Sequence, residues 1–531
     1  MDKYYKAFQF SNGLVSAVQH DNLEMAQWLC QVYCPTMGFA TKAMIEAVEG
    51  GNLSIVQWLT EHREDIIYSS SMVEEAASHG HLEILKWLHS HPRSRGCVNN
   101  RSWEALCNAV YAGHLEVAQF LLRHEYILSI SHSRDYTEWC GGFDMIKWLH
   151  ESPLLGWVDD ALRQVVEQGK LDIVRWIYDN CTEGLANGGI PPNDNDENEW
   201  NRWTIHGNYT YPMDIAATEG HLDMVKWLYK NRSEGYSDTA VVGAAMNGHL
   251  DILKWLHALP SSVESKMAMQ QAAANGHLHV VKWLHEHCPG QNSATAMNFA
   301  AGRGHLNIVK WLHENGGGCT AAAMDGAARS GHLDIVKWLH ENRREGCTTN
   351  AMDYAAGNGH LDIIEWLDSN RDEGCTTQAM DNAATNGHLH VVKWLHEHCK
   401  EGCTSYAMDN AALKGHLDVV KWLHENRTEG CTTRAMDHAK SIEITRFLHE
   451  NRLEGCTTDA IDCAVNVSDF DRVLYLHTHR SEGCSSRAAF YALNQNNFEV
   501  LLWLNENYPD QVDLVEIRRT YGIAETLLTA G

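Results

Sequence analysis

Histidine and cysteine are the residue types in this chain most able to do chemistry, with 33 and 16 copies in 531 residues. The sequence His-Glu-His-Cys occurs twice, at 285–288 and 396–399, and Cys403 follows the second copy closely. A structural zinc ion would need four such ligands converging as a tetrahedron. On a helix, His396 and His398 are two positions apart and diverge, and most histidines recur in the same context, Gly-His or Trp-Leu-His. We therefore predict a repeated structural role for the histidines and no metal site.

The sequence also offers no convincing candidates for catalytic residues. A nucleophilic mechanism needs a nucleophile, a base and an orienting group in one irregular pocket, whereas each prominent Cys, His and Asp here belongs to a repeating pattern. The glycines at 316–318 are not followed by the Lys-Ser or Lys-Thr of a phosphate loop. The segment from Asp194 begins like a calcium loop, but it lacks the required Gly and has Ile205 at the twelfth position. We predict no enzyme activity, no catalytic residues and no cofactor.

Half of the cysteines recur at one place in the repeat. They are Cys97, Cys319, Cys347, Cys375, Cys403, Cys431, Cys456 and Cys484. Packed helical units stand about 8–10 Å apart, whereas a disulfide needs Cα atoms within about 7 Å. Residues 1–30 lack the basic start and apolar run of a signal peptide, and no later stretch of about 18 apolar residues appears. We expect reduced, packed thiols and a cytoplasmic location, with the nucleus as the alternative.

A bulky aromatic residue followed by an apolar one recurs along the whole chain, mostly at intervals of about 28 residues, and a fixed period of this kind is typical of repeat architectures. The seventeen positions are Trp28, Trp58, Trp87, Phe120, Trp148, Trp176, Trp227, Trp255, Trp283, Trp311, Trp338, Trp366, Trp394, Trp422, Phe447, Tyr475 and Trp503. A stacked array also explains how 531 residues can fold without one large core, since each unit buries its surface against its neighbours.

One unit, residues 348–373, shows the expected structure. Thr348 or Thr349 can cap a first helix, and Asp353 lies near enough to its start to favour the helix dipole. Gly359 ends that helix, and from His360 a second helix begins that is apolar over most of its circumference. The repeated aromatic falls on the buried side of this second helix, as a stacking ladder. With no alternating strand pattern, we predict an all-α solenoid of about 17 stacked helix-turn-helix repeats.

The segment AA-x-x-G-H-L-D-I-V-K-W-L, which runs from Ala327 to Leu339 and recurs nearly verbatim, resembles the ankyrin repeat. The likeness covers almost the whole chain but has two departures. The Thr-Pro-Leu-His start of ankyrin units is replaced by Asn350–Asp353, so the usual Thr and His hydrogen-bonding roles are not carried over. The period is about 28 rather than about 33 residues, which clips the projecting β-turn between units. This short variant is similar to the large ankyrin families of protists and giant viruses.

The regularity of the repeat changes along the chain and suggests four segments. Residues 1–181 hold irregular ankyrin-like repeats, and 182–212 form an acidic insertion rich in Gly, Pro and Asn, in which Trp200 and Trp203 could make contacts. Residues 213–440 hold the regular repeats, and 441–531 hold degenerate repeats and a cap. We expect a polar-faced helix at 516–530 to cover the last apolar face.

Residues that vary on the copied frame are the candidates for recognition, on the concave surface built by first helices and turns. The predicted partner-binding residues are Gln271, Phe299, Arg303, Arg329, Tyr354, Asn382, Asn410, Lys414 and His438, with Trp200 and Trp203 in the insertion. Neutral drift at exposed positions is the alternative explanation. The net charge of −27 disfavours nucleic acid and anionic membranes as partners.

We therefore predict a monomeric, non-catalytic scaffold that binds a partner protein on its concave face. The resemblance also suggests a substrate-recruiting adaptor of a ubiquitin ligase, although no F-box-like segment is evident. A purely mechanical spacer is the third hypothesis.

Overall fold

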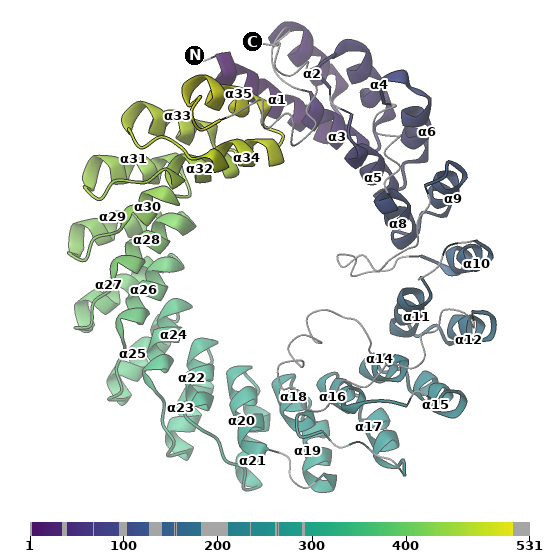
Figure 1. The fold of residues 1–531 in the computed structure, drawn as a ribbon. Helices are drawn as coiled ribbons and strands as arrows, with labels where there is room; N and C mark the ends of the chain where they lie inside the picture. Colours follow the sequence, from purple (N-terminus) through teal and green to yellow (C-terminus); the bar gives the residue numbers. More distant parts are fainter. Residues whose placement is uncertain are drawn as a thin grey trace. The chain divides into compact units, whose positions relative to one another are not determined.

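The computed structural model of the chain describes residues 3–33, 40–66, 68–94, 103–126, 141–152, 154, 157–181, 211–233, 235–260, 263, 265–288 and 292–512 (Figure 1). Within these ranges every regular element is a helix, and the helices follow one another as short pairs. The expected all-α solenoid of stacked helix-turn-helix repeats is confirmed.

Each pair consists of a first and a second helix. The first helices are α1 (Lys3–Gln19), α3 (Thr41–Glu49), α5 (Ser70–Ser78), α8 (Trp103–Tyr111), α11 (Val158–Glu167), α14 (Pro212–Thr218), α16 (Asp238–Met246), α18 (Ala268–Ala274), α20 (Ser293–Gly302), α22 (Ala322–Arg329), α24 (Thr349–Gly357), α26 (Thr377–Thr385), α28 (Ser405–Lys414), α30 (Thr433–Asp437), α32 (Asp459–Asn466) and α34 (Ser486–Asn494).

All seventeen repeated aromatics lie on second helices. These are α2 (Leu23–Trp28), which continues as the π-helix η1 (Leu29–Tyr33), α4 (Leu53–His62), α6 (Leu82–Ser90), which the 3₁₀ turn η2 (Pro92–Ser94) follows, α9 (Leu115–Arg123), α10 (Phe143–Glu151), α12 (Leu171–Asn180), α15 (Leu222–Asn231), α17 (Leu250–His257), α19 (Leu278–His287), α21 (Leu306–Glu314), α23 (Leu333–Asn342), α25 (Leu361–Asn370), α27 (Leu389–His398), α29 (Leu417–Asn426), α31 (Ile442–Asn451), α33 (Phe470–His479) and α35 (Phe498–Asn507).

The turn between the two helices of a unit depends on its Gly-His pair. Gly359 has a φ of +79°, which a residue with a side chain adopts only at a cost. A Cβ at Gly359 would also lie 2.8 Å from the ring of His388, the equivalent histidine of the next unit. In the same arrangement, the ring nitrogen Nε2 of His305 lies 3.1 Å from the carbonyl oxygen of Ala274 in the preceding unit. The glycine thus makes room for a histidine that ties neighbouring units, which confirms the structural role predicted for this class of histidine.

The first helix starts at the predicted cap, but its aspartate has a different role from the one we predicted. The Thr348 hydroxyl accepts from the amide of Asn350, as an N-cap should. Asp353 is only 1% exposed, and it accepts bonds of 2.8 and 2.7 Å from the amide and hydroxyl of Thr376 in the next unit. We predicted that Asp353 would interact with the helix dipole. Its hydrogen bonds instead go to Thr376, so the carboxylate joins two repeats.

The core is built from small residues on first helices and branched residues on second helices. In one unit Ala355 and Ala356 are fully buried, as are Ile363 and Ile364. The aromatic ladder is less buried than predicted, because Trp366 stays partly exposed at the edge of the stack. Its ring meets His340 of the preceding unit edge to face, with centroids 5.2 Å apart. The ladder is thus made of His–Trp pairs rather than of aromatic residues alone.

The chain divides into two compact units. The first comprises residues 1–164, 181–184 and 457–531, and the second comprises 165–180 and 185–456. In the first unit α1 packs against α35, so the opening helix of the chain covers the last repeat. The Phe8 ring lies 5.4 Å from that of Phe470, and the Tyr4 hydroxyl donates to Glu506 at 2.6 Å. The terminal helix predicted at 516–530 lies outside the described residues.

In the second unit, first helices pack in a continuous row from α14 to α30, each against the next. These helices lie along the inner side of the curved row, and the second helices lie along its outer side (Figure 1). The shorter interval between Trp422 and Phe447 coincides with a shortened first helix, since α30 has five residues where α28 has ten. The division into four segments, which rests on how regular the repeat sequence is, stays a prediction.

Candidate protein-binding face

The residue before each Ala-Ala pair occupies the same place on successive first helices. We call these positions the inner row. Its members are Gln271, Phe299, Gly326, Tyr354, Asn382 and Asn410, with His438 at the equivalent position before Ala439-Lys440. They lie on or at the end of the first helices α18 to α30, which line the inner side of the second unit (Figure 1).

The inner row is only partly open to solvent. Phe299 is 43% exposed, whereas the other members with side chains are half-buried. The cause is close packing of neighbouring first helices: a Cβ on Gly357 would lie 3.0 Å from the Cβ of Asn382 in the next unit. Each row residue therefore rests on the residue that follows the preceding Ala-Ala pair, and its outer part remains available for contact.

The three predicted basic residues, Arg303, Arg329 and Lys414, are exposed at the C-terminal ends of first helices. The Arg329 guanidinium lies over the ring of Tyr354 in the next unit, 5.2 Å from its centroid. The structure thus brings these two predicted residues together, and this stacking holds the Tyr354 ring in place. The predicted contacts Trp200 and Trp203 lie outside the described residues.

Two exposed apolar residues on α28 were missed. Tyr406 is 55% exposed and Leu413 is 38% exposed. They stand four positions before and three after Asn410, so all three share one face of the helix. That spacing was visible in the sequence, but our comparison was confined to the positions beside the Ala-Ala pair.

The acidic residues of the first helices from α18 to α30 are buried or bonded to the next unit. They are Asp325, Asp353, Asp381, Asp409 and Asp437. The first four each accept bonds from the amide and hydroxyl of a threonine in the next unit. Asp437 is buried. The exposed charged residues within these first helices and at their C-terminal ends are therefore basic, although the chain carries a net charge of −27.

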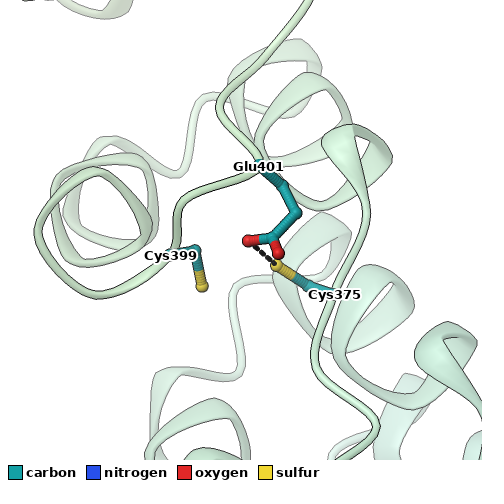
Figure 2. A group of neighbouring side chains, drawn as sticks. All are labelled: Cys375, Cys399 and Glu401. Carbon is teal, nitrogen blue, oxygen red and sulfur yellow. Dashed lines mark hydrogen bonds between the residues drawn. The ribbon is translucent and has the colours of Figure 1, made fainter.

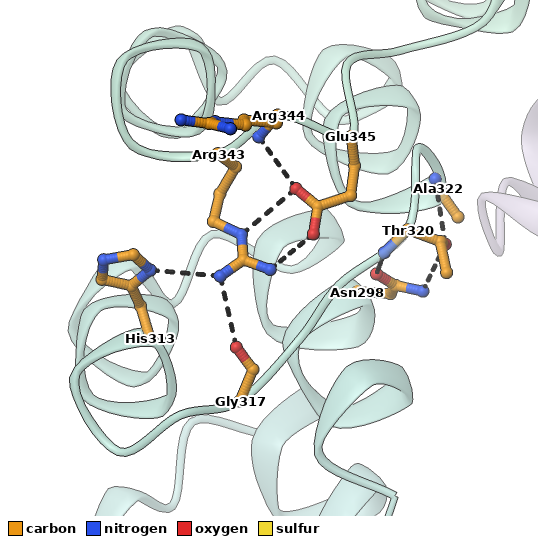
Figure 3. Close-up of polar contacts among 8 residues, drawn as sticks. All are labelled: Asn298, His313, Gly317, Thr320, Ala322, Arg343, Arg344 and Glu345. Carbon is orange, nitrogen blue, oxygen red and sulfur yellow. Dashed lines mark hydrogen bonds and ion pairs between the residues drawn. The ribbon is translucent and has the colours of Figure 1, made fainter.

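The turns between units carry a second recurring contact, which we call the arginine bridge. Arg343 lies five residues after Trp338 and donates to Glu345 at 2.5 Å (Figure 3). Its other nitrogen, Nη1, lies 3.3 Å from Nδ1 of His313 and 3.3 Å from the oxygen of Gly317, both in the preceding unit. The equivalent arginines are Arg371, Arg427, Arg452 and Arg480, each paired with the glutamate two residues later.

The bridge shifts the titration of its members. The hydrogen bond from Arg343 lowers the pKa of Glu345 to about 2. Burial raises the pKa of Cys347 to about 11 and that of Cys403 to about 12, so these thiols stay protonated and unreactive. Cys399 differs, since a hydrogen bond from Cys375 lowers the pKa of its thiol.

The described cysteines are all free, in agreement with the expected reduced thiols. In the described part of the chain, no helix is both long enough and apolar enough to cross a bilayer.

Comparison with known families agrees with this geometry. The model described as "Ankyrin repeats (3 copies)" matches residues 241–325 and 352–437. The model described as "Ankyrin repeats (many copies)" matches 73–122, 213–257 and 319–367. Together the matches cover just over half of the chain. A search of curated proteins found no match. The repeated frame and these matches show that the chain belongs to the ankyrin-repeat family, whose arrays are protein–protein interaction modules and generally non-catalytic scaffolds.

Proposed function

We propose that this protein is a non-catalytic scaffold that binds a segment of a partner protein along the inner row of α18 to α30. The observation that carries the proposal is the exposure of Phe299, Tyr406 and Leu413 on first helices whose repeated Ala-Met and Ala-Ala residues are buried. Aromatic side chains at the centre of an interface commonly supply most of its binding energy.

The charges beside the row suggest the chemistry of the partner. Arg303, Arg329 and Lys414 flank the exposed apolar residues, and the aspartates of the same helices are bonded to the next unit. A partner segment with both acidic and apolar side chains would find complementary groups here. The second helices α23, α25, α29 and α31 carry more acidic than basic residues and would disfavour the same segment on the outer side.

The test compares proteins captured from the source cell by three forms of the full chain. Phe299→Ala combined with Tyr406→Ala should lose one or more proteins that the wild type captures, with at least a tenfold fall in yield. Leu453→Ala removes an equally apolar side chain that is fully exposed in a turn, and should capture the wild-type set. Since both aromatic side chains are exposed, the double variant should unfold at the wild-type urea concentration.

Identical capture by the double variant and the wild type would count against the inner row. Loss in the Leu453→Ala control as well would point to general surface stickiness. The ubiquitin-ligase adaptor and the mechanical spacer stay predictions, since no observation in the described residues favours either.

A further inference from the structure

Three potential metal ligands converge where α24 and α25 meet the next unit. The two Sγ atoms of Cys375 and Cys399 and a carboxylate oxygen of Glu401 all lie within 4.8 Å of one another (Figure 2). The distance from Cys375 Sγ to Glu401 Oε2 is 3.8 Å. Cys375 is buried, Cys399 is half-buried and Glu401 is exposed, so the group is open to solvent on one side.

Cys399 occupies the position that carries the arginine bridge in other units. It stands one repeat after Arg371 and one repeat before Arg427, and Glu401 stands where the bridging glutamates stand. Cys288 and Cys181 occupy the same position, but the place held by Cys375 is taken by Glu264 or Trp157 in their units. Only at Cys399 does the recurring cysteine of the preceding unit complete a pair.

The shorter side chain leaves room beside the loop. A Cβ on Gly346 would lie 2.5 Å from the Arg371 guanidinium, and one on Gly402 would collide with that of Arg427. At Gly374, the equivalent position of this interface, no heavy atom of the described structure lies within 4 Å of such a Cβ. The interface therefore lacks the group that fills its neighbours.

The substitution also removes positive charge. In the bridged interfaces an arginine pairs with each glutamate, whereas no ion pair in the described part of the chain joins Glu401 to a lysine or arginine. A second change occurs at the same interface. In the bridges of Arg371 and Arg427, the preceding second helix carries His340 and His396 at one shared position. At the Cys399 interface that position is Asp368. Lys400 is the one basic residue of the turn 399–403, and it is exposed. Two thiols and one carboxylate thus meet where the bridged interfaces have an arginine.

We propose that Cys375, Cys399 and Glu401 bind a zinc ion that joins two neighbouring repeats in place of the arginine bridge. Zinc takes thiolate sulfur at about 2.3 Å and carboxylate oxygen at about 2.0–2.2 Å in a tetrahedron, which places adjacent ligand atoms roughly 3.5–3.8 Å apart. The 3.8 Å between Cys375 and Glu401 fits that spacing. Magnesium and calcium prefer oxygen ligands alone and do not suit a site with two sulfurs.

On binding, both thiols lose their protons to solvent and the ion keeps its +2 charge, so no oxidant or reductant is needed. Three protein ligands leave the fourth position to water. This proposal departs from the sequence-based expectation of no metal site, because Cys399 meets a cysteine that is distant in sequence and not the histidines of its own helix. The site is independent of the proposed partner-binding face.

The experiment titrates zinc into the full, reduced, metal-free chain in competition with a coloured chelator. Because 33 histidines can bind zinc weakly, the readout is the difference between the wild type and Cys399→Arg. This variant introduces the residue that stands at the same position in the bridges of Arg343, Arg371, Arg427, Arg452 and Arg480, so it should fold. We expect the wild type to bind one more tightly held zinc per chain, and Cys375→Ser to lose that ion.

Two further variants make the test specific. Glu401→Gln should weaken binding at least tenfold, whereas Cys403→Ser, at the equivalent cysteine of the Arg427 bridge, should bind as the wild type does. Cobalt bound in place of zinc should give a sulfur-to-metal absorption band that Cys399→Arg and Cys375→Ser lack. Equal zinc stoichiometry in the wild type and Cys399→Arg, or equal loss in Cys403→Ser, would overturn the proposal.

Discussion

Two neighbouring repeat interfaces share one backbone frame but are bridged by different side chains. At the first, Cys375 faces Cys399 and Glu401; at the next, one repeat further along, Cys403 faces Arg427 and Glu429. Both keep the Asp–Thr bonds between units, from Asp353 to Thr376 and from Asp381 to Thr404. The Asp–Thr contacts are therefore kept at both interfaces, whereas the outer bridge is exchanged.

The reason is the environment of each contact. The Asp–Thr bonds use a main-chain amide in a position shielded from water, where an unpaired group is costly. The arginine bridge is partly exposed, with about a quarter of each side chain open at Arg427 and Glu429. Exposed ion pairs contribute little, so selection on stability alone tolerates their replacement.

The shared frame gives the largest expected effect. Asp353→Ala and Asp381→Ala each remove the acceptor of two hydrogen bonds, one at either interface. Each should lower the free energy of unfolding by about 2–4 kcal/mol. Urea denaturation followed by circular dichroism measures both losses. A single hydrogen bond contributes up to about 1.5 kcal/mol net. If the two losses differ by more than this amount, the frame is not equivalent at the two interfaces.

Alanine substitutions at Gly374 and Gly402 should lower the free energy of unfolding by unequal, smaller amounts at the two interfaces. Gly374 and Gly402 have φ values of +68° and +71°, so alanine costs about 1–2 kcal/mol at either from backbone strain. At Gly402 the new Cβ also displaces the Arg427 guanidinium, whereas it has space at Gly374. We expect Gly402→Ala to be the more destabilising in urea denaturation. Equal losses would mean that the arginine moves aside freely.

Converting one interface into the other should have a modest effect in the opposite direction. In a metal-free buffer, Cys399→Arg should stabilise the chain by about 0.5–1 kcal/mol, because it supplies a partner for Glu401. Thermal unfolding in the presence of a chelator measures the change. A lower melting temperature than that of the wild type would indicate that the space beside Gly374 does not accept a guanidinium.

Acid should expose the smallest difference. The folded-state pKa of Glu345 lies at about 2, below its unfolded value, because Arg343 donates to it. The stabilisation is therefore present above about pH 4.5 and is lost as the pH falls toward 2. Since Glu345 is about a third exposed, Glu345→Gln should cost under about 1 kcal/mol at pH 6. The gap between the urea midpoints of the two proteins should be smaller at pH 3 than at pH 6, and a constant gap would contradict the ion pair.

Local signals made much of the fold predictable. Thr348 caps its helix as expected, and Gly359 ends the first helix of the unit. The seventeen aromatics mark the second helices because the same short-range pattern is written many times. Of the proposed binding face, the exposed Phe299 and the paired Arg329 and Tyr354 were named from variation between units, whereas Tyr406 was not named.

Contacts between units were harder to predict. Cys399 was compared with nearby histidines along its own helix, although alignment of the units places it at the arginine position, beside Cys375 of the preceding unit. The role of Asp353 was misjudged for the same reason, since its partner lies 23 residues away. Sequence spacing says which positions are equivalent, but the packing of one unit on the next decides which atoms meet.

The helix pairs and the family could be read from the sequence, because both depend on propensities and periodicities within about 28 residues. Only the tertiary structure decided that α1 covers the last repeat, since that contact joins opposite ends of the chain, as between Ser11 and Glu499. It also decided that two cysteines and a glutamate converge at one interface. The physical reason is that side-chain distances between stacked units depend on the pitch of the array, which no single unit encodes.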